Sequence, residues 1–358
     1  PVKRVEIPKD NGKMRLLGIP TVIDRLVQQA INQTLTPIYE HQFSPRSYGF
    51  RPRRGCHDAL RGAQKIIDDG YIYVVDLDLE RFFDTVSHSK LIEILSRTIK
   101  DGRVISLIHK YLRSGVMNKG MFEASEEGTP QGGPLSPLLS NIMLNELDKE
   151  LTRRGLPFVR YADDSMIFCK SKRAAKRVKE SVTRFIERKL HLKVNRDKTV
   201  VSYVQGVKYL GYSFYVMKGK CQLTVHPKAK SKMKAKLKEL TSRSNGWGYA
   251  KRKQKLEEYI RGWVGYYHLA NMKRFLMETD EWLRRMCIWK SWKRVKTRIA
   301  NLIKCGIDKY QAYMWSNSRL GYWRIAGSYI LSRAITNEKL SMAGYATLTG
   351  SYLEWYPK

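Results

Sequence analysis

Two adjacent aspartates between two apolar segments are the feature that most limits what this chain can fold into. Asp163 and Asp164 separate residues 158–161 from residues 165–169, and both flanking segments are apolar and aromatic. Asp is depleted in strands and favoured in turns, so the pattern predicts a hairpin with an acidic tip. Adjacent carboxylates repel one another, and Mg²⁺, which prefers carboxylate oxygens and water, would neutralise them. A solvated Asp-Asp turn is the alternative that this hairpin alone leaves open.

A second acidic position lies at the end of an upstream apolar segment. Residues 71–78 are aromatic and β-branched up to Asp76 and Asp78, a strand pattern whose last residue is acidic. Side chains alternate along a strand, so Asp76 and Asp78 share one face. If this strand pairs with the hairpin, Asp78, Asp163 and Asp164 converge. Converging carboxylates that hold two Mg²⁺ ions are typical of in-line phosphoryl transfer, which needs no covalent nucleophile.

The charge of the chain points to a polyanionic partner. The 358 residues include 67 Lys and Arg against 33 Asp and Glu, a formal net charge of +34. Such a chain repels itself unless a polyanion is present, and nucleic acid phosphates accept many Lys and Arg contacts. An anionic membrane surface is the rival partner, but no apolar run approaches the roughly 18 to 20 residues of a spanning helix. We therefore expect a nucleic-acid-binding protein without a membrane segment.

Cysteine and histidine usage favours a reducing compartment. Five cysteines are spread along the chain without a Cys-x-x-Cys pair: Cys56, Cys169, Cys221, Cys287 and Cys305. This spacing argues against a disulfide framework or a zinc site and favours the cytoplasm. The seven histidines show no metal-binding spacing. Because the chain begins at Pro1 without an initiating Met or a signal peptide, we expect that an N-terminal portion is missing.

The order of patterns along the chain indicates a change of domain near residue 227. Residues 1–20 show a hairpin pattern with turn residues at 10–12, and a capping box then opens a helix over residues 21–40. Helical and strand patterns alternate to residue 225. Lysines then fall on alternate residues from 228 to 238 beside an apolar stripe. Residues 227–358 hold 28 Lys and Arg against 9 acidic residues, so we expect a separate, helical and more basic domain.

Several motifs together resemble a known enzyme family. Residues 78–84 (DLERFFD) are similar to polymerase motif A, and residues 161–164 (YADD) are similar to motif C of reverse transcriptases. The resemblance is closest to group II intron-encoded reverse transcriptases, also called maturases, and it follows the family's order over nearly the whole chain. Further segments carry it at residues 7–9, 47–52, 129–137, 195–198, 210–212, 239–241, 261–263 and 289–292. We expect a class C-like member with no endonuclease domain and with the family's N-terminal extension missing.

The resemblance implies an α/β right-hand polymerase. It places α/β fingers at residues 1–70, the palm at residues 71–226, and an α-helical thumb (X or maturase domain) at residues 227–358. The implied reaction adds dNTPs to a DNA or RNA primer 3′-OH on an RNA template, with two Mg²⁺ ions for which Mn²⁺ is a possible substitute. The implied further roles are binding of group II intron RNA, help in its splicing, and copying of the intron during retrohoming. The implied location is the bacterial cytoplasm, in association with the nucleoid or a ribonucleoprotein, and no obligate protein partner is evident.

The resemblance also assigns catalytic roles to individual residues. Asp78, Asp163 and Asp164 would hold the metal ions, with the Leu79 carbonyl as an additional ligand. Lys198 stands at the position of the family's motif D lysine, which would protonate the leaving pyrophosphate. A surface lysine explains Lys198 nearly as well.

Four residues are expected at the incoming dNTP. Phe83 would be the steric gate that excludes a ribose 2′-OH, with a core aromatic residue as the alternative. Lys9 and Arg15 would clasp the triphosphate from the finger hairpin, although isolated residues of this kind are usually solvated surface charges. Gln131 lies in a Gly- and Pro-rich run and would contact the nucleotide sugar or base, whereas a turn before a helix explains the same run.

Contacts with nucleic acid are expected at three places. A basic loop would contact template phosphates through Arg51, Arg53 and Arg54, with Arg51 as a buried ion-pair partner in the alternative. The segment that resembles the primer grip, or else forms a plain hairpin, is Leu210, Gly211 and Tyr212. Phosphate contacts that carry no base readout are expected from the lysine-rich helix at Lys228, Lys232 and Lys236.

Two alternative functions stay open from the sequence. A non-catalytic RNA-binding splicing cofactor could retain a polymerase fold, but such a protein has no need to concentrate carboxylates beside phosphates. A domesticated reverse transcriptase used in repair or defence would carry the same motifs. An intron ribozyme flanking the gene would distinguish an intron-encoded enzyme from a domesticated one.

Overall fold

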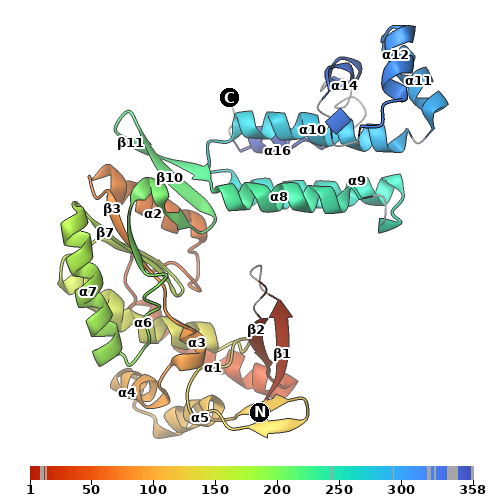
Figure 1. Ribbon diagram of the computed structural model, residues 1–358. Helices are drawn as coiled ribbons and strands as arrows, with labels where there is room; N and C mark the ends of the chain where they lie inside the picture. Colours follow the sequence, from red (N-terminus) through yellow and green to blue (C-terminus); the bar gives the residue numbers. More distant parts are fainter. Residues whose placement is uncertain are drawn as a thin grey trace. The chain divides into compact units, whose positions relative to one another are not determined.

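The computed structural model describes most of the chain, namely residues 1–8, 12, 14–242, 245–292, 294–320, 324–325, 328–336 and 346–355 (Figure 1). The chain divides into two compact units, residues 1–207 with 214–221 and residues 208–213 with 222–358. The predicted division between fingers and palm falls inside the first unit. The predicted start of the thumb at Pro227 falls inside the second. None of the helices in the described ranges is long and apolar enough to cross a membrane.

The first unit begins with a four-stranded sheet. β1 (Val2–Pro8) and β2 (Met14–Ile19) form the predicted antiparallel hairpin, and the turn that carries Lys9 lies outside the described residues. β1 also pairs in parallel with β4 (Val116–Asn118), which pairs with β5 (Met121–Glu123), so the strand order is β2-β1-β4-β5. The sequence analysis did not anticipate β4 and β5, because three residues are too few for a strand to show alternation.

Two helices follow the hairpin in sequence, and the first begins as the sequence predicts. α1 (Val22–Glu40) starts after Thr21, whose Oγ1 accepts a hydrogen bond of 3.1 Å from the Asp24 amide. α2 (Cys56–Asp68) starts after Gly55, whose amide donates to Asp58 Oδ2 at 2.9 Å. Each bond satisfies a backbone donor that the first turn of a helix leaves unpaired.

A second antiparallel sheet forms the centre of the first unit. Its strands are, in spatial order, β6 (Phe158–Tyr161), β7 (Asp164–Cys169), β3 (Tyr73–Leu77) and β8 (Val200–Tyr203). Val75, Ile167 and Phe158 are paired across three strands, and all three belong to the main hydrophobic core. Because side chains alternate along a strand, the neighbouring residues Asp76 and Met166 lie on the opposite face.

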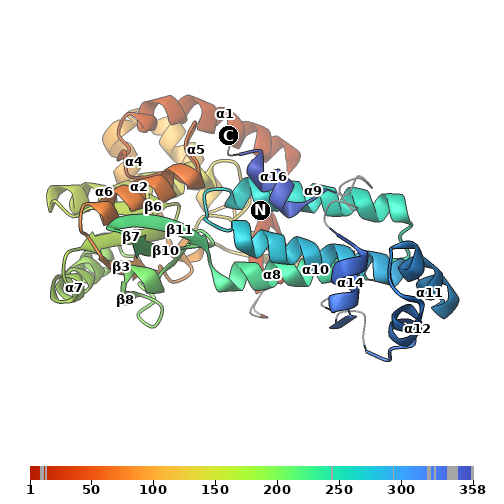
Figure 2. The same ribbon diagram turned by 90° about the horizontal axis from the view of Figure 1, so that it is seen from above.

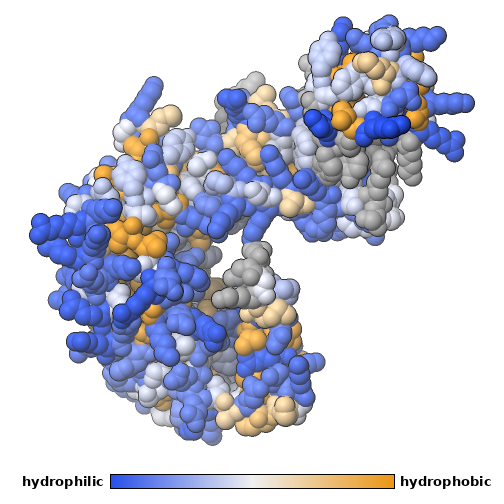
Figure 3. Space-filling view, viewed as in Figure 1, coloured by the Kyte–Doolittle hydropathy of each residue, from blue (hydrophilic) through white to orange (hydrophobic). Residues whose placement is uncertain are grey.

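Helices cover the core face of this sheet (Figures 1 and 2). They are α6 (Ser136–Arg153) and α7 (Lys172–Lys189); α4 (His88–Thr98) packs against α6, and α5 (Gly102–Leu112) packs against α4. The short α3 (Phe82–Thr85) follows β3. Twelve of the 18 residues of α6 are buried, which identifies it as the central helix. By contrast, α7 buries only Ala175, Val182 and Ile186, and Figure 3 shows hydrophilic side chains over its outward face.

The second unit is helical, as predicted. Its described helices are α8 (Pro227–Leu240), α9 (Tyr249–Tyr267), α10 (Lys273–Ser291), α11 (Val295–Lys304), α12 (Lys309–Ser316), α14 (Tyr329–Ala334) and α16 (Leu348–Leu353). The buried Asp280 of α10 accepts hydrogen bonds of 2.8 Å from the amides of Leu348 and Thr349, which fixes the start of α16. A third sheet, in the order β11 (Lys220–Val225), β10 (Tyr212–Met217) and β9 (Lys208–Tyr209), contains residues of both units.

Candidate active site

The acidic tip between β6 and β7 is a two-residue turn. Tyr161 pairs with Asp164, so Ala162 and Asp163 are the turn residues. Ala162 has φ +57°, the left-handed value that the first turn residue of a type II′ hairpin requires. This conformation costs about 1–2 kcal/mol for a residue with a side chain, so the surrounding structure must hold it.

A buried arginine holds this turn. The Arg160 side chain is fully buried, and its Nε and Nη2 donate to the two carboxylate oxygens of Asp148 at 2.8 and 2.6 Å. Its Nη1 donates to Asn141 Oδ1 at 3.0 Å and to the Ala162 carbonyl at 2.9 Å. A buried charge is tolerated when it is paired and fully hydrogen-bonded, as Arg160 is. Arg160 thereby ties the acidic turn to α6, a role that the sequence analysis missed.

The loop that precedes α2 packs directly on the same turn. The Tyr48 amide donates to the Arg160 carbonyl at 2.8 Å. A Cβ added at Gly49 would lie 2.3 Å from the Ala162 backbone nitrogen, closer than non-bonded atoms can approach. Gly49 therefore permits a backbone contact that no other residue type allows.

The pairing of β3 with β7 brings Asp78 to the acidic turn. It ends with Leu77 opposite Ser165, and Asp78 and Asp164 are the next residues of the two segments. Asp163, the adjacent turn residue, completes the predicted set. The predicted approach of the upstream strand to the acidic hairpin is thus present in the backbone.

Three acidic residues lie near one another on this face of the sheet. Asp76 lies two residues before Asp78 on the same side of β3. Burial and, to a lesser extent, the carboxylates of Asp164 and Asp78 raise the pKa of Asp76 to about 6. Neighbouring like charges that raise the pKa of a carboxyl group mark a position where a cation would be stabilised. The sequence predicts that Asp76 shares the face of Asp78 and assigns it no role.

The side chains do not form a closed metal cage. Within the described residues, no three His, Cys, Asp or Glu side chains are gathered so that they could hold a metal ion. The donor set still fits a hard divalent cation, because carboxylate oxygens are the ligands that Mg²⁺ prefers and several carboxylates lie near one another here. The metal assignment to Asp78, Leu79, Asp163 and Asp164 stays a prediction.

A short segment after α7 fixes the backbone beside Asp78. The Asp78 carbonyl accepts from the Asn195 amide at 2.9 Å, and the Glu80 amide donates to the Lys193 carbonyl at 2.8 Å. Leu79 lies between these two bonds, opposite Val194. Because carbonyls alternate in direction along extended chain, the Leu79 carbonyl points away from this segment.

The same segment brings Lys198 to the aspartates. Lys198 Nζ lies 3.4 Å from Asp78 Oδ2, and both side chains are partly exposed. The Lys198 amide donates to Asn195 Oδ1 at 3.2 Å, and Thr199 Oγ1 accepts from the Asp78 amide at 3.2 Å. The structure therefore unites Lys198 with the predicted metal ligands, and its proton-donor role stays a prediction.

Two of the residues predicted at the dNTP are hydrogen-bonded to each other. Arg15 Nε on β2 donates to Gln131 Oε1 at 2.9 Å, and the Gly18 amide donates to the Gln131 carbonyl at 2.7 Å. The finger strand is thus attached to the loop before α6 through both the backbone and the side chain of Gln131.

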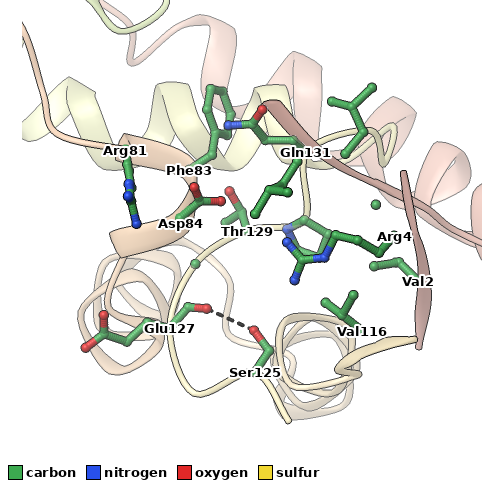
Figure 4. Close-up of a pocket in the computed structure, with 15 residues that line it drawn as sticks. Val2, Arg4, Arg81, Phe83, Asp84, Val116, Ser125, Glu127, Thr129 and Gln131 are labelled. Carbon is green, nitrogen blue, oxygen red and sulfur yellow. Dashed lines mark hydrogen bonds between the residues drawn. The ribbon is translucent and has the colours of Figure 1, made fainter. Parts of the chain in front are cut away.

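Phe83 lies in the first turn of α3 and not on an extension of β3. The chain turns at Arg81, which has φ +46°, and α3 begins at Phe82. Phe83 is half-buried and lines a cavity of about 230 Å³ together with Gln131, Thr129 and Arg4. Figure 4 shows the Gln131 amide beside the Phe83 ring. Three of the four predicted dNTP residues are therefore placed together, and Lys9 lies outside the described residues.

The predicted template contact is wrong for Arg51. Its side chain is only 3% exposed, and Nη2 lies 2.6 Å from Glu40 Oε1. Its Nη1 donates to the carbonyls of Ser44 and Ser47 at 2.6 and 2.9 Å. The guanidinium is occupied in holding the loop, so the buried ion-pair alternative is correct.

The two neighbouring arginines, Arg53 and Arg54, differ in how far their side chains are exposed for contact with the template. Arg53 is exposed and has φ +58°. Arg54 is half-buried, and its Nη1 donates to the Pro45 carbonyl at 2.7 Å. Template contact stays a prediction for both.

The predicted primer-grip residues form a tight hairpin in which Tyr212 is inaccessible. Leu210 and Gly211 have φ +49° and +82°, as a type I′ turn requires. Tyr212 is fully buried, and its hydroxyl donates to the Tyr266 carbonyl. Direct contact of Tyr212 with nucleic acid is therefore wrong, because its ring packs inside the second unit. Contact by Leu210 and Gly211, which are half-buried, stays a prediction.

The lysine-rich helix α8 has the predicted division of faces. Ala229, Met233 and Leu237 are buried, as the apolar stripe predicts. Three exposed lysines follow one another at intervals of four residues: Lys228, Lys232 and Lys236. Residues spaced in this way are about 6 Å apart along a helix. Phosphate contact by this row stays a prediction.

The sheet, the acidic turn and the adjoining finger loop together define a polymerase palm of the reverse transcriptase class. The family model for reverse transcriptase (RNA-dependent DNA polymerase) matches residues 7–214, and the model for the group II intron maturase-specific domain matches residues 230–306. The first match covers more than half of the chain, so this chain belongs to the reverse transcriptase family. The predicted resemblance to group II intron reverse transcriptases is confirmed. Enzymes of this family generally use divalent metal ions such as Mg²⁺.

Curated relatives agree with this assignment. Protein YkfC of Escherichia coli (strain K12) is 38% identical over 251 residues, an alignment that covers 59% of this chain and 66% of YkfC. The group II intron-encoded protein LtrA of Lactococcus lactis subsp. cremoris is 33% identical over 282 residues, covering 60% of this chain and 47% of LtrA. The matched region therefore spans between about half and two thirds of these relatives.

Solved structures agree at the level of the fold. The structure of apo telomerase from Candida tropicalis matches with a TM-score of 0.53 at 13% identity, covering all of this chain and 67% of that one. The structure of telomerase from Candida albicans in complex with a fragment of telomeric RNA matches with a TM-score of 0.51 at 12% identity, covering 96% and 64%. The predicted fold class is confirmed.

Proposed function

We propose that this chain is an RNA-directed DNA polymerase of the group II intron-encoded type. It would add dNTPs to a primer 3′-OH on an RNA template. The observation that carries the proposal is the pairing of β3 with β7, whose last pair, Leu77 and Ser165, is followed directly by Asp78 on one segment and Asp164 on the other. A protein that only bound RNA would lose affinity by placing carboxylates there, because they repel phosphates.

The acidic residues would bind the metal ions that the reaction requires. Asp78, Asp163 and Asp164, with the Leu79 carbonyl, would hold two Mg²⁺ ions, for which Mn²⁺ could substitute. Bound there, the ions would supply activation of the primer 3′-OH and neutralisation of charge on the leaving pyrophosphate. Arg160 would keep Asp163 and Asp164 in place through the Ala162 carbonyl.

The residues of the finger loop would receive the nucleotide. Arg15 would exchange its bond to Gln131 for the triphosphate, since guanidinium groups bind phosphate oxygens in a bidentate manner. Gln131 and Phe83 would then contact the sugar, with the Phe83 ring excluding a 2′-OH. Arg4 Nε and Thr129 Oγ1, which line the same cavity, are buried without a hydrogen-bond partner, as expected of a cavity that receives a polar ligand. Lys198 would donate the proton to pyrophosphate.

The second unit would bind RNA. The maturase-specific match at residues 230–306 and the lysine row of α8 support binding of group II intron RNA and help in its splicing. Copying of the intron during retrohoming would follow from polymerisation by the same protein. We place the protein in the bacterial cytoplasm, associated with the nucleoid or a ribonucleoprotein, and we propose no obligate protein partner.

Primer extension on an RNA template tests the proposal. With dNTPs and Mg²⁺, we expect extension by the wild type and none by Asp163→Asn, which keeps the size of the side chain but removes its charge. The matched control is Glu126→Gln, an exposed acidic residue outside the aspartate set, which should extend normally. RNA affinity should be similar in all three proteins. Extension by Asp163→Asn at the wild-type rate would reject the site.

A further inference from the structure

The loop of residues 127–131 is fastened to α3 on one side. Glu127 pairs with Ser87 in an isolated antiparallel bridge. The Gly128 amide donates to the Val86 carbonyl at 2.8 Å, and the Thr129 amide donates to the Phe83 carbonyl at 2.6 Å. The backbone that carries Phe83 is therefore bonded directly to the loop that carries Gln131.

Close backbone packing makes this attachment tight. Gly128 has φ +88°, and a Cβ at this position would lie 2.8 Å from the Phe83 carbonyl oxygen. On the other side of the loop, Gly18 and Arg15 of β2 hold Gln131. The loop thus sets how far Gln131 lies from Phe83.

One side chain from α4 completes the attachment. His88 is only 5% exposed, and its Nε2 lies 2.7 Å from the Gly128 carbonyl oxygen. A carbonyl can only accept a hydrogen bond, so Nε2 carries the proton in this contact. Burial lowers the pKa of His88, which favours the neutral imidazole. His88 therefore anchors the Gly128 carbonyl. Gly128 lies between Thr129, whose amide bonds to Phe83, and Glu127, which forms the bridge to Ser87.

We propose that His88 is a positioning residue that fixes the spacing between Phe83 and Gln131, and so sets how strongly the enzyme prefers deoxyribose over ribose. The inference rests on the proposed polymerase function. His88 does not line the cavity and would act through the Gly128 carbonyl.

The consequence follows from geometry. Without the imidazole donor, the Gly128 carbonyl is buried and unpaired, and the loop relaxes toward another donor or water. Misplacement by about 1 Å at a site that discriminates on shape can lower the reaction rate on the order of 100-fold. Relaxation of the loop would change the space beside the Phe83 ring, where a 2′-OH is excluded. It would leave the aspartates untouched, because Arg160 and Gly49 hold them independently.

Replacing His88 with Gln or with Asn tests the proposal, because the two amide side chains differ in length. In His88→Gln the side-chain nitrogen can reach the position of Nε2, whereas in His88→Asn it falls short. We expect His88→Asn to raise the KM for dNTP and to lower the dNTP over NTP preference about tenfold with a smaller change in kcat, as fits a partial loss of positioning. His88→Gln should keep both the KM for dNTP and the dNTP over NTP preference close to their wild-type values. The matched control is Asn145→Ala, which removes another buried side-chain bond to a carbonyl, that of Gln42 at 3.1 Å.

The outcomes separate this inference from the proposed function. An unchanged preference in His88→Asn, while Phe83→Ala alters it, would overturn the inference alone. Equal losses in His88→Asn, His88→Gln and Asn145→Ala, parallel to their losses in thermal stability, would overturn it as well. Failure of Phe83→Ala to change the preference would remove the gate, and the His88 inference with it. Recovery in His88→Gln but not in His88→Asn supports it.

Discussion

Arg15 Nε lies 2.9 Å from Gln131 Oε1, although 116 residues separate them along the chain. The bond joins the finger strand β2 to the loop before α6. Both partners were predicted from the sequence to contact the incoming nucleotide, and the structure bonds them to each other. If Arg15 exchanges this bond for a triphosphate, as proposed, the Gln131 side-chain oxygen is released at the same step.

Replacing Arg15 with Lys tests whether the planar guanidinium matters. Lys keeps the charge but cannot form the bidentate contact, so we expect the KM for dNTP to rise about tenfold, the equivalent of one charge-assisted hydrogen bond. RNA affinity should be unchanged in a filter-binding assay. Arg103→Lys is the matched control, because the Arg103 side chain is 95% exposed. A KM for Arg15→Lys equal to that of the control would exclude Arg15 from the nucleotide site.

The sequence was most informative where a pattern repeats or a residue type has few uses. The strand pattern at residues 71–78 and the acidic tip at Asp163 and Asp164 predicted two strands and the face on which their carboxylates meet. The apolar stripe of α8 likewise predicted which of its residues are buried. These features depend on local alternation, which can be seen in a single sequence.

The contacts that could not be predicted from the sequence involve residues that lie far apart in the chain. Arg51 and Arg53 look alike in sequence, and only the position of Glu40 makes one a buried ion pair. Arg160 lies in an apolar strand segment, and its partner Asp148 lies on a separate helix. No local pattern distinguishes His88 from the other six histidines. Tertiary contacts of this kind have no local signal.

Arg160→Met is expected to unfold the palm more easily and to abolish activity. It leaves Asp148 buried without its partner, which costs about 3–5 kcal/mol of the free energy of unfolding. Adding Asp148→Leu removes the unpaired charge, so the double variant should regain most of the stability. It should still not extend a primer, because the Ala162 carbonyl has lost its donor.

Chemical denaturation and primer extension distinguish these two effects. If the double variant regains activity together with stability, Arg160 serves stability alone and does not position the acidic turn. If it regains stability only, the turn needs the guanidinium. Wild-type RNA affinity in the double variant would show that the second unit is intact.

Gly49→Ala is expected to stop primer extension. The new Cβ would lie 2.3 Å from the Ala162 nitrogen, and the neighbouring atoms are backbone that cannot move aside without displacing Asp163. Gly102→Ala is the matched control, since a Cβ there meets no atom within 4 Å. Gly102 begins α5, so the control should be as stable as the wild type or up to about 1 kcal/mol more stable. Normal extension by Gly49→Ala would show that the turn tolerates displacement.

The contrast between Arg51 and Arg53 tests the corrected template contact. Arg51→Ala should lower the free energy of unfolding by about 1–3 kcal/mol, because Glu40 and two carbonyls lose a buried donor. Arg53→Ala should leave stability unchanged and weaken RNA binding. If Arg53 neutralises one phosphate, the slope of log affinity against log salt should fall by about 0.7–0.9. Salt titrations of RNA binding by folded protein measure this directly. An unchanged slope in Arg53→Ala would remove Arg53 from the template contact.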